Sequence, residues 1–199
     1  MNPATPEDLF AFLDSLGIAH ATVAHVPVHT VAESRDLKAG MPGGHSKNLF
    51  LKDKNGRLFL VVAEAETRID LKRLHGPLGA RGRLSFGSPE LLFERVGVRP
   101  GSVTPFGLLN DRDGTVCVIL DAGLMAHDPV NFHPLHNGAT TAVAPGDLIR
   151  FLGGDGASAA GDGAAGAAGG RSGGVARAPE SAQLRRPPGH SGAAQRSPE

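Results

Sequence analysis

The composition of the chain changes abruptly at Gly153, and this change limits how much of the 199 residues can fold. From there on the sequence consists mainly of Gly, Ala, Ser, Pro and Arg, and its only larger aliphatic residues are Val175 and Leu184. Ordering a backbone costs about 1 to 2 kcal/mol per residue, which such a segment has too little apolar surface to offset. The sequence therefore predicts one folded domain over residues 1–152 and a disordered tail over residues 153–199.

The predicted domain carries almost no net charge, with 15 Lys and Arg against 16 Asp and Glu in residues 1–152. It lacks the dense positive field with which sequence-independent nucleic-acid binders attract phosphate. We therefore expect no DNA partner, and we expect any RNA to be bound through a few placed contacts. The tail has five Arg against four acidic residues. We expect it to be solvated, and a weak contact between its arginines and RNA is the alternative.

The sequence offers no means of entering a membrane and little for redox chemistry. No stretch approaches the roughly 18 apolar residues of a membrane span, and the N-terminus has no basic region followed by a long apolar run. These features predict a cytoplasmic protein with no membrane partner. Cys117 is the single cysteine, so no intramolecular disulfide or thiolate metal cluster can form. We expect it to be a buried strand residue.

Helix and strand signals mix along the domain without strict alternation, which predicts an α/β fold of the α+β type, with a mixed central sheet surrounded by helices. Thr5 followed by Pro6 is typical of a helix start, and the polar residues 53–56 between two apolar runs are typical of a hairpin. The expected helices are 5–16, 31–39, 70–75, 88–96 and a last turn over 145–151. In the fourth of these, Leu91, Leu92 and Phe93 are expected to pack in the core. The expected strands are 21–25, 48–52, 58–63, 115–120, 130–132 and 140–143.

Three segments are hard to explain as core or as ordinary turns: residues 43–53, 101–107 and 132–137. Lys47 and Asn48 stand at the mouth of an apolar strand in the first. Taken singly, each segment has an ordinary structural interpretation, because a lysine at a strand end is usually solvated and Gly and Pro four residues apart usually form a turn.

Histidines near the third segment raise the alternative of a zinc site, since His127, His133 and His136 are closely spaced and imidazole is a common zinc ligand. The intervening Pro129 and Pro134 argue against one helical face that presents all three. We therefore expect neither a metal nor another cofactor.

The three segments occur together, and in this order, within long stretches of matching sequence. These stretches are HSKNLFLKDKNGRLFLVV, RLSFGSPELLFERVGVRPGSVTPFGLLND and VNFHPLHNGATTAV. They resemble the YbaK-type aminoacyl-tRNA editing family, and within it the freestanding prolyl-tRNA editing proteins of the alanyl-tRNA(Pro) deacylase branch. The resemblance covers most of residues 45–143, and the tail has no counterpart in it.

The resemblance implies a hydrolase that removes the amino acid from mischarged tRNA(Pro), with alanine as the expected amino acid. Its partners would be the tRNA acceptor end and, as a further partner, prolyl-tRNA synthetase. A synthetase pocket shaped for proline cannot exclude the smaller alanine, because one missing methylene is worth only about 1 to 3 kcal/mol of discrimination. The alternatives are cysteinyl-tRNA(Pro) or another aminoacyl-tRNA as substrate, and a module that binds tRNA or a synthetase without hydrolysis.

An aminoacyl ester is already activated, so the site has only to polarise its carbonyl and place a water. Gly101 permits unusual backbone angles and Pro105 fixes the loop exit, so the amides of Ser102, Val103 and Thr104 can form an oxyanion-type cradle. The resemblance adds Lys47 as the most important catalytic residue and a substrate-assisted mechanism without metal. The residues expected to bind the substrate are Asn48, His133, His45 and Phe106.

Overall fold

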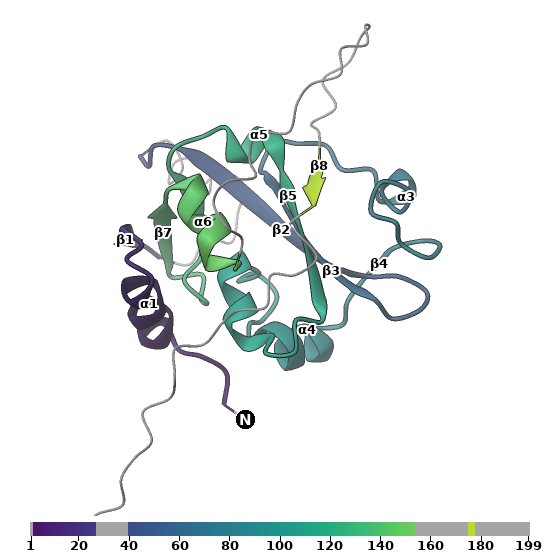
Figure 1. The fold of residues 1–199 in the computed structure, drawn as a ribbon, viewed down its shortest axis with the longest axis horizontal. Helices are drawn as coiled ribbons and strands as arrows, with labels where there is room; N and C mark the ends of the chain where they lie inside the picture. The colour runs from purple at the N-terminus through teal and green to yellow at the C-terminus, as the bar shows by residue number, and fades with distance from the viewer. Residues whose placement is uncertain (1, 27–39, 154–174, 178–199) are drawn as a thin grey trace, which may run out of the picture.

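The computed structural model describes residues 2–26, 40–153 and 175–177 (Figure 1). An eight-stranded sheet runs in the order β1-β7-β6-β2-β3-β5-β8, with β4 paired to β2 off this path. The strands are β1 (His20–Ala24), β2 (Gly44–Lys52), β3 (Leu58–Glu64), β4 (Ser85–Phe86), β5 (Val116–Asp121), β6 (Val130–Phe132), β7 (Ala139–Val143) and β8 (Val175–Arg177). The helices are α1 (Pro6–Ser15), α3 (Leu71–Leu74), α4 (Pro89–Val96), the 3-10 helix η1 (Pro105–Asn110), α5 (Ala122–Met125) and α6 (Pro145–Phe151).

The sheet is mixed, as predicted. β2 and β3 form an antiparallel hairpin, whereas β3 pairs with β5 and β2 pairs with β6 in the parallel sense. The Asp53 carboxylate holds the hairpin turn by accepting hydrogen bonds from the amides of Asn55, Arg57 and Arg81, at 2.8 to 3.0 Å. The third of these bonds fastens the chain before β4 to the hairpin.

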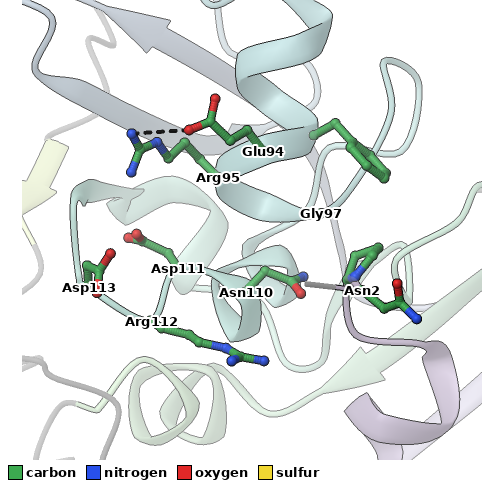
Figure 2. A pocket seen from close by; sticks show the side chains of 10 residues that line it. Asn2, Glu94, Arg95, Gly97, Asn110, Asp111, Arg112 and Asp113 are labelled. Atoms are coloured by element: carbon green, nitrogen blue, oxygen red, sulfur yellow. Dashed lines mark ion pairs between the residues drawn. The ribbon is translucent and has the colours of Figure 1, made fainter.

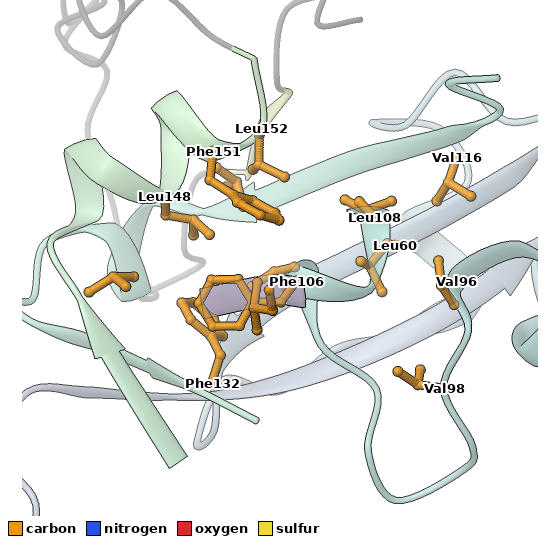
Figure 3. Packing of buried hydrophobic residues seen from close by; sticks show 14 of the residues in the cluster. Leu60, Val96, Val98, Phe106, Leu108, Val116, Phe132, Leu148, Phe151 and Leu152 are labelled. Atoms are coloured by element: carbon orange, nitrogen blue, oxygen red, sulfur yellow. The ribbon is translucent and has the colours of Figure 1, made fainter. Parts of the chain in front are cut away.

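Alternating side chains of β3 build two separate cores. Leu58, Leu60 and Val62 face a large cluster that also takes in buried residues of α1, α4, η1 and α6 (Figure 3). Phe59 and Val61 point to the other face and join a smaller cluster, against which the apolar residues of α3 pack. Burial of both sheet faces explains why β3 is a continuous apolar run rather than an alternating one. Helices therefore cover the sheet on both sides, as the sequence predicted.

Most helices begin at the predicted cap. Thr5 and Asp8 form a capping box at α1, and the Asp70 and Ser88 side chains cap α3 and α4.

Two packing expectations are wrong. Phe93 is 40% exposed, with the Arg99 guanidinium 5.2 Å from its ring centre. Cys117 lies on β5 but is only half-buried. The short elements β4, η1 and α5 were not expected, because two to six residues give too little periodicity to recognise.

Three residues of the predicted tail are ordered as β8, which pairs antiparallel with β5. An unpaired strand edge is a template for any extended segment, and β5 provides one. Residues 154–174 and 178–199 lie outside the described residues, so for them disorder stays a prediction. The expected helix 31–39 also lies outside them. None of the helices in the described ranges is long and apolar enough to cross a membrane.

Candidate active site

Lys47 lies inside β2 rather than at its mouth, because the strand begins at Gly44, four residues earlier than expected. Its ammonium nitrogen donates hydrogen bonds to the carbonyl oxygens of Ala65, at 3.0 Å, and of Thr67. No carboxylate of the described residues forms an ion pair with it. An ammonium has three N–H groups, so two are occupied by carbonyls and one is left for a ligand. The result is a fixed positive charge with a spare donor.

The 101–105 loop lies against this strand. The Asn48 side-chain nitrogen Nδ2 donates a hydrogen bond to the Val103 carbonyl oxygen at 2.9 Å. This bond joins the first and second predicted segments. Gly101 has φ +90°, a conformation that favours glycine. The Ser102 amide is occupied by the Arg99 carbonyl at 3.0 Å, so it is not part of a free cradle.

Two amides of this loop remain as candidate donors. Neither Val103 nor Thr104 has an acceptor for its backbone N–H among the described residues. The Thr104 hydroxyl instead caps η1 by accepting from the Phe106 amide. The Asn48 side-chain oxygen Oδ1 is buried and finds no donor within the described part of the chain. The loop and β2 together thus offer two N–H donors and one acceptor without partners.

His133 is held in one tautomer. Its Nδ1 lies 3.1 Å from the Ala139 carbonyl oxygen, which can only accept, so Nδ1 carries the hydrogen. Burial lowers the pKa of His133 below its ordinary value, against the opposing effect of the Ala139 hydrogen bond, and the charges of His25 and His136 lower it further. The ring is therefore neutral at pH 7, with Nε2 as a hydrogen-bond acceptor.

The third segment approaches the loop through Asn137, which lies in that segment but was not among the predicted site residues. A β-carbon on Gly101 would lie 4.0 Å from the Asn137 side-chain nitrogen. Asn137 follows the histidines in the sequence, and only its proximity to Gly101 in space marks it. Ala65 and Thr67 were missed as well, because backbone carbonyls leave no sign in a sequence.

Two predicted site residues have their side chains engaged elsewhere in the fold. His45 Nε2 is bonded to the Met41 carbonyl at 3.0 Å. Phe106 is fully buried, and its ring packs against Phe132 and Phe151. Phe106 supports the loop from the core side, and a contact of its ring with substrate stays a prediction.

The histidines considered for zinc are separated. His127 pairs with Glu64 at 2.9 Å, His133 bonds Ala139, and His136 accepts from the Gly138 amide. Across residues 2–26 and 40–153, no three His, Cys, Asp or Glu side chains come together as a metal site.

A separate hollow of about 370 Å³ lies between α4 and the end of η1 (Figure 2). Its lining includes Glu94 and Arg95, which pair with each other, together with Asn110 and Asp113. None of the predicted site residues lines it. The Asn48 bond joins β2 to the 101–105 loop, and Asn137 brings the segment of His133 to the same loop. The candidate active site is this region of the fold, with Lys47 next to Asn48 on β2, and not the hollow.

The mixed α/β sheet agrees with the fold expected from the resemblance to aminoacyl-tRNA editing domains. Residues 25–151 match the aminoacyl-tRNA editing domain family. The chain belongs to this family, which confirms the resemblance to YbaK-type editing proteins, and it is an aminoacyl-tRNA deacylase.

Its relatives carry names that concern prolyl-tRNA. The chain is 35% identical over 157 residues to the prolyl-tRNA editing protein ProX of Acetoanaerobium sticklandii, covering 78% of this chain and 95% of that protein. It is 38% identical over 148 residues to prolyl-tRNA synthetase associated domain-containing protein 1 of Danio rerio, covering 73% and 80%. A crystal structure described as a trans-editing enzyme for prolyl tRNA synthetase has the same fold, with a TM-score of 0.61 and 21% identity, over 75% of this chain and 92% of that one.

Proposed function

We propose that this protein deacylates mischarged tRNA(Pro) in trans, with alanyl-tRNA(Pro) as its substrate. The observation that carries the proposal is the fixed Lys47 ammonium, which the carbonyls of Ala65 and Thr67 hold. Lys47 lies on β2, the strand that contacts the 101–105 loop through Asn48. The names of the ProX and synthetase-associated relatives support proline-specific tRNA and an association with prolyl-tRNA synthetase.

The chemistry follows from what this site supplies. The amides of Val103 and Thr104 are candidates to polarise the ester carbonyl, because preorganised N–H donors stabilise the charge that develops on that oxygen. The neutral Nε2 of His133 can accept a hydrogen bond from the amino group or ribose of the aminoacyl-adenosine. We propose that a ribose hydroxyl of the substrate orients the water, without a metal and without a covalent intermediate.

Deacylation assays with alanyl-, cysteinyl- and prolyl-tRNA(Pro), run side by side, test the proposal. We expect release of free alanine at the highest kcat/KM. Faster release of cysteine would assign the alternative substrate. Protection of the tRNA 3′ end without release of any amino acid would instead make the protein a binding module. Loss of activity with a chelator and its recovery with zinc would refute the metal-free mechanism.

An uneven charge distribution supports contact with the tRNA acceptor end. Residues 52–83 contain eight Lys and Arg against four Asp and Glu, whereas the rest of 1–152 has seven against twelve. One of those four acids, Asp53, is buried in the hairpin turn. The basic stretch includes exposed Lys54, Arg57, Arg81 and Arg83, and it begins at the end of the strand that carries Lys47. A domain that is neutral overall thus contains a basic stretch.

The double variant Lys54→Gln/Arg81→Gln is expected to raise KM with little change in kcat, since distant phosphate contacts bind ground and transition states equally. The slope of log affinity against log salt should become shallower by about one for each phosphate that the variant no longer binds. Filter binding at several salt concentrations measures it. Arg95→Gln, in the hollow of Figure 2, is the control and should keep the wild-type slope. An unchanged slope in the double variant would place the tRNA elsewhere.

The pH dependence of deacylation should reflect His133. Because burial holds the pKa of His133 below its ordinary value of 6.5, the neutral ring persists as pH falls through 6.5, and the rate should decline only at lower pH. The measurement is the pH–rate profile of kcat/KM, corrected for uncatalysed ester hydrolysis. His133→Gln removes the titrating ring, so its pH–rate profile should lack the decline of kcat/KM at low pH. If the variant keeps the same decline as the wild type, another group titrates.

A further inference from the structure

A buried carboxylate outside the proposed site is connected to Lys47 through one residue. Asp121 ends β5 and is only 4% exposed. One of its oxygens accepts from the Gly123 amide at 3.1 Å, which caps α5. The other accepts from the Glu64 amide at 3.1 Å and from the Thr67 hydroxyl at 2.9 Å. The Asp121 carboxylate thus fastens the chain that leaves β3.

That chain is the turn whose carbonyls hold the Lys47 ammonium. The turn is closed by the Thr67 amide, which donates to the Glu64 carbonyl at 3.0 Å, and the Ala65 amide is bonded to the His45 carbonyl at 2.8 Å. β3 and β5 are parallel neighbours, with Val62 opposite Leu120, so Asp121 lies at the point where β3 ends. Each end of the turn is therefore fixed to a neighbouring strand.

We propose that Asp121 is a positioning residue for Lys47, acting through the Thr67 hydroxyl, which sets where the Thr67 carbonyl meets the ammonium. This inference rests on the proposed function for the role of Lys47. Asp121 itself contacts neither Lys47 nor, in this proposal, the substrate. A free ammonium on a four-carbon stem samples many positions, and electrostatic stabilisation depends on a donor that is fixed before the reaction. The hydrogen-bonded series from Asp121 to Thr67 to Lys47 supplies that fixation.

Thr67→Val tests the series, because it removes the hydroxyl and keeps the branched shape and the backbone carbonyl. We expect kcat to fall on the order of tenfold, as for loss of one hydrogen bond that orders a charged group, with KM nearly unchanged. Thr67→Ser keeps the hydroxyl and should restore most of the rate. Asp121→Asn should act in the same direction, with an additional loss of stability, because its amide nitrogen would face N–H donors.

The chain provides a matched control at the opposite end of β5. The Thr115 hydroxyl donates to the Asp111 carboxylate at 2.8 Å, and Asp111 also accepts from the amides of Thr115 and Val116. Thr115→Val therefore removes the same kind of bond to the same kind of buried carboxylate, away from Lys47. We expect it to lower stability about as much as Thr67→Val and to leave kcat unchanged.

Two readouts separate positioning from general support of the fold. In a Lys47→Ala background, Thr67→Val should cause no further loss of the deacylation rate. If Thr67→Val lowers the rate by the same factor with Lys47 present and with Lys47 replaced, the proposal is overturned. The second readout is the ¹H–¹⁵N correlation signal of the Lys47 ammonium, which needs no substrate. It should be visible in the wild type, where hydrogen bonds slow its exchange, and absent in Thr67→Val. Retention of the signal would overturn the proposal, whereas absence of deacylation by the wild type would count only against the proposed function.

Discussion

Replacing Lys47 by alanine is expected to lower kcat for deacylation of alanyl-tRNA(Pro) by about 10²- to 10³-fold, the cost of losing one preorganised donor to a developing oxyanion. The physical reason is the fixed ammonium. Two carbonyls hold it, and no carboxylate of the described residues neutralises it. Single-turnover kinetics with excess enzyme measure the chemical step directly.

The division of the effect between kcat and KM decides between two roles for Lys47. If the ammonium stabilises charge that develops in the reaction, kcat falls and KM changes little; if it holds the terminal phosphate or ribose, KM rises and kcat is kept. The restrained geometry favours the first role. An unchanged kcat would contradict it.

Lys52→Ala is the matched control for this experiment. Lys52 lies on the same strand five residues later, beside β4, so its side chain points to the opposite face from that of Lys47. Its removal should leave kcat unchanged and affect at most the binding of tRNA. Lys47→Arg is a stricter variant, because it keeps the charge in a planar fork that does not fit two carbonyls placed for an ammonium.

The sequence predicted those parts of the fold that depend on local chemistry. Caps at Thr5, Asp70 and Ser88 and the turn over residues 53–56 place hydrogen bonds within a few residues of each other, so their signals lie close together in the chain. The mixed sheet followed from the order of the elements. Phe93 was assigned to the core wrongly, because on an eight-residue helix a shift of one position moves a side chain from the buried face to the exposed one.

The site was predictable only in part, since its assembly depends on contacts between distant segments. The bond from Asn48 to Val103 spans 55 residues, and that from Thr67 to Asp121 spans 54. Nothing local in the sequence pairs these residues. The resemblance to a family identified Lys47 and the 101–105 loop, but the carbonyls that hold Lys47 belong to a turn without any motif.

Phe106 follows Pro105 directly, and its position beside the loop suggested a contact with substrate. η1 instead turns its ring inward. The ring is fully buried, with its centre 5.6 Å from that of Phe132 and 5.3 Å from that of Phe151, and both pairs are edge-on (Figure 3). The ring therefore links η1, β6 and α6 in the main core, and its energetic role is that of a core residue.

Phe106→Ala is accordingly expected to destabilise the protein by about 3 to 5 kcal/mol, because apolar burial is removed and a cavity is left behind. For a domain of this size the melting temperature should fall by roughly 6 to 20 °C. Urea unfolding should show a lower midpoint with an unchanged slope, which marks a change in stability rather than in the unfolded state. Phe86→Ala is the control, because that ring is 59% exposed and its removal should cost less than about 0.5 kcal/mol. Normal stability of Phe106→Ala together with a raised KM would mean that the ring leaves the core to contact the aminoacyl group, as the sequence analysis predicted.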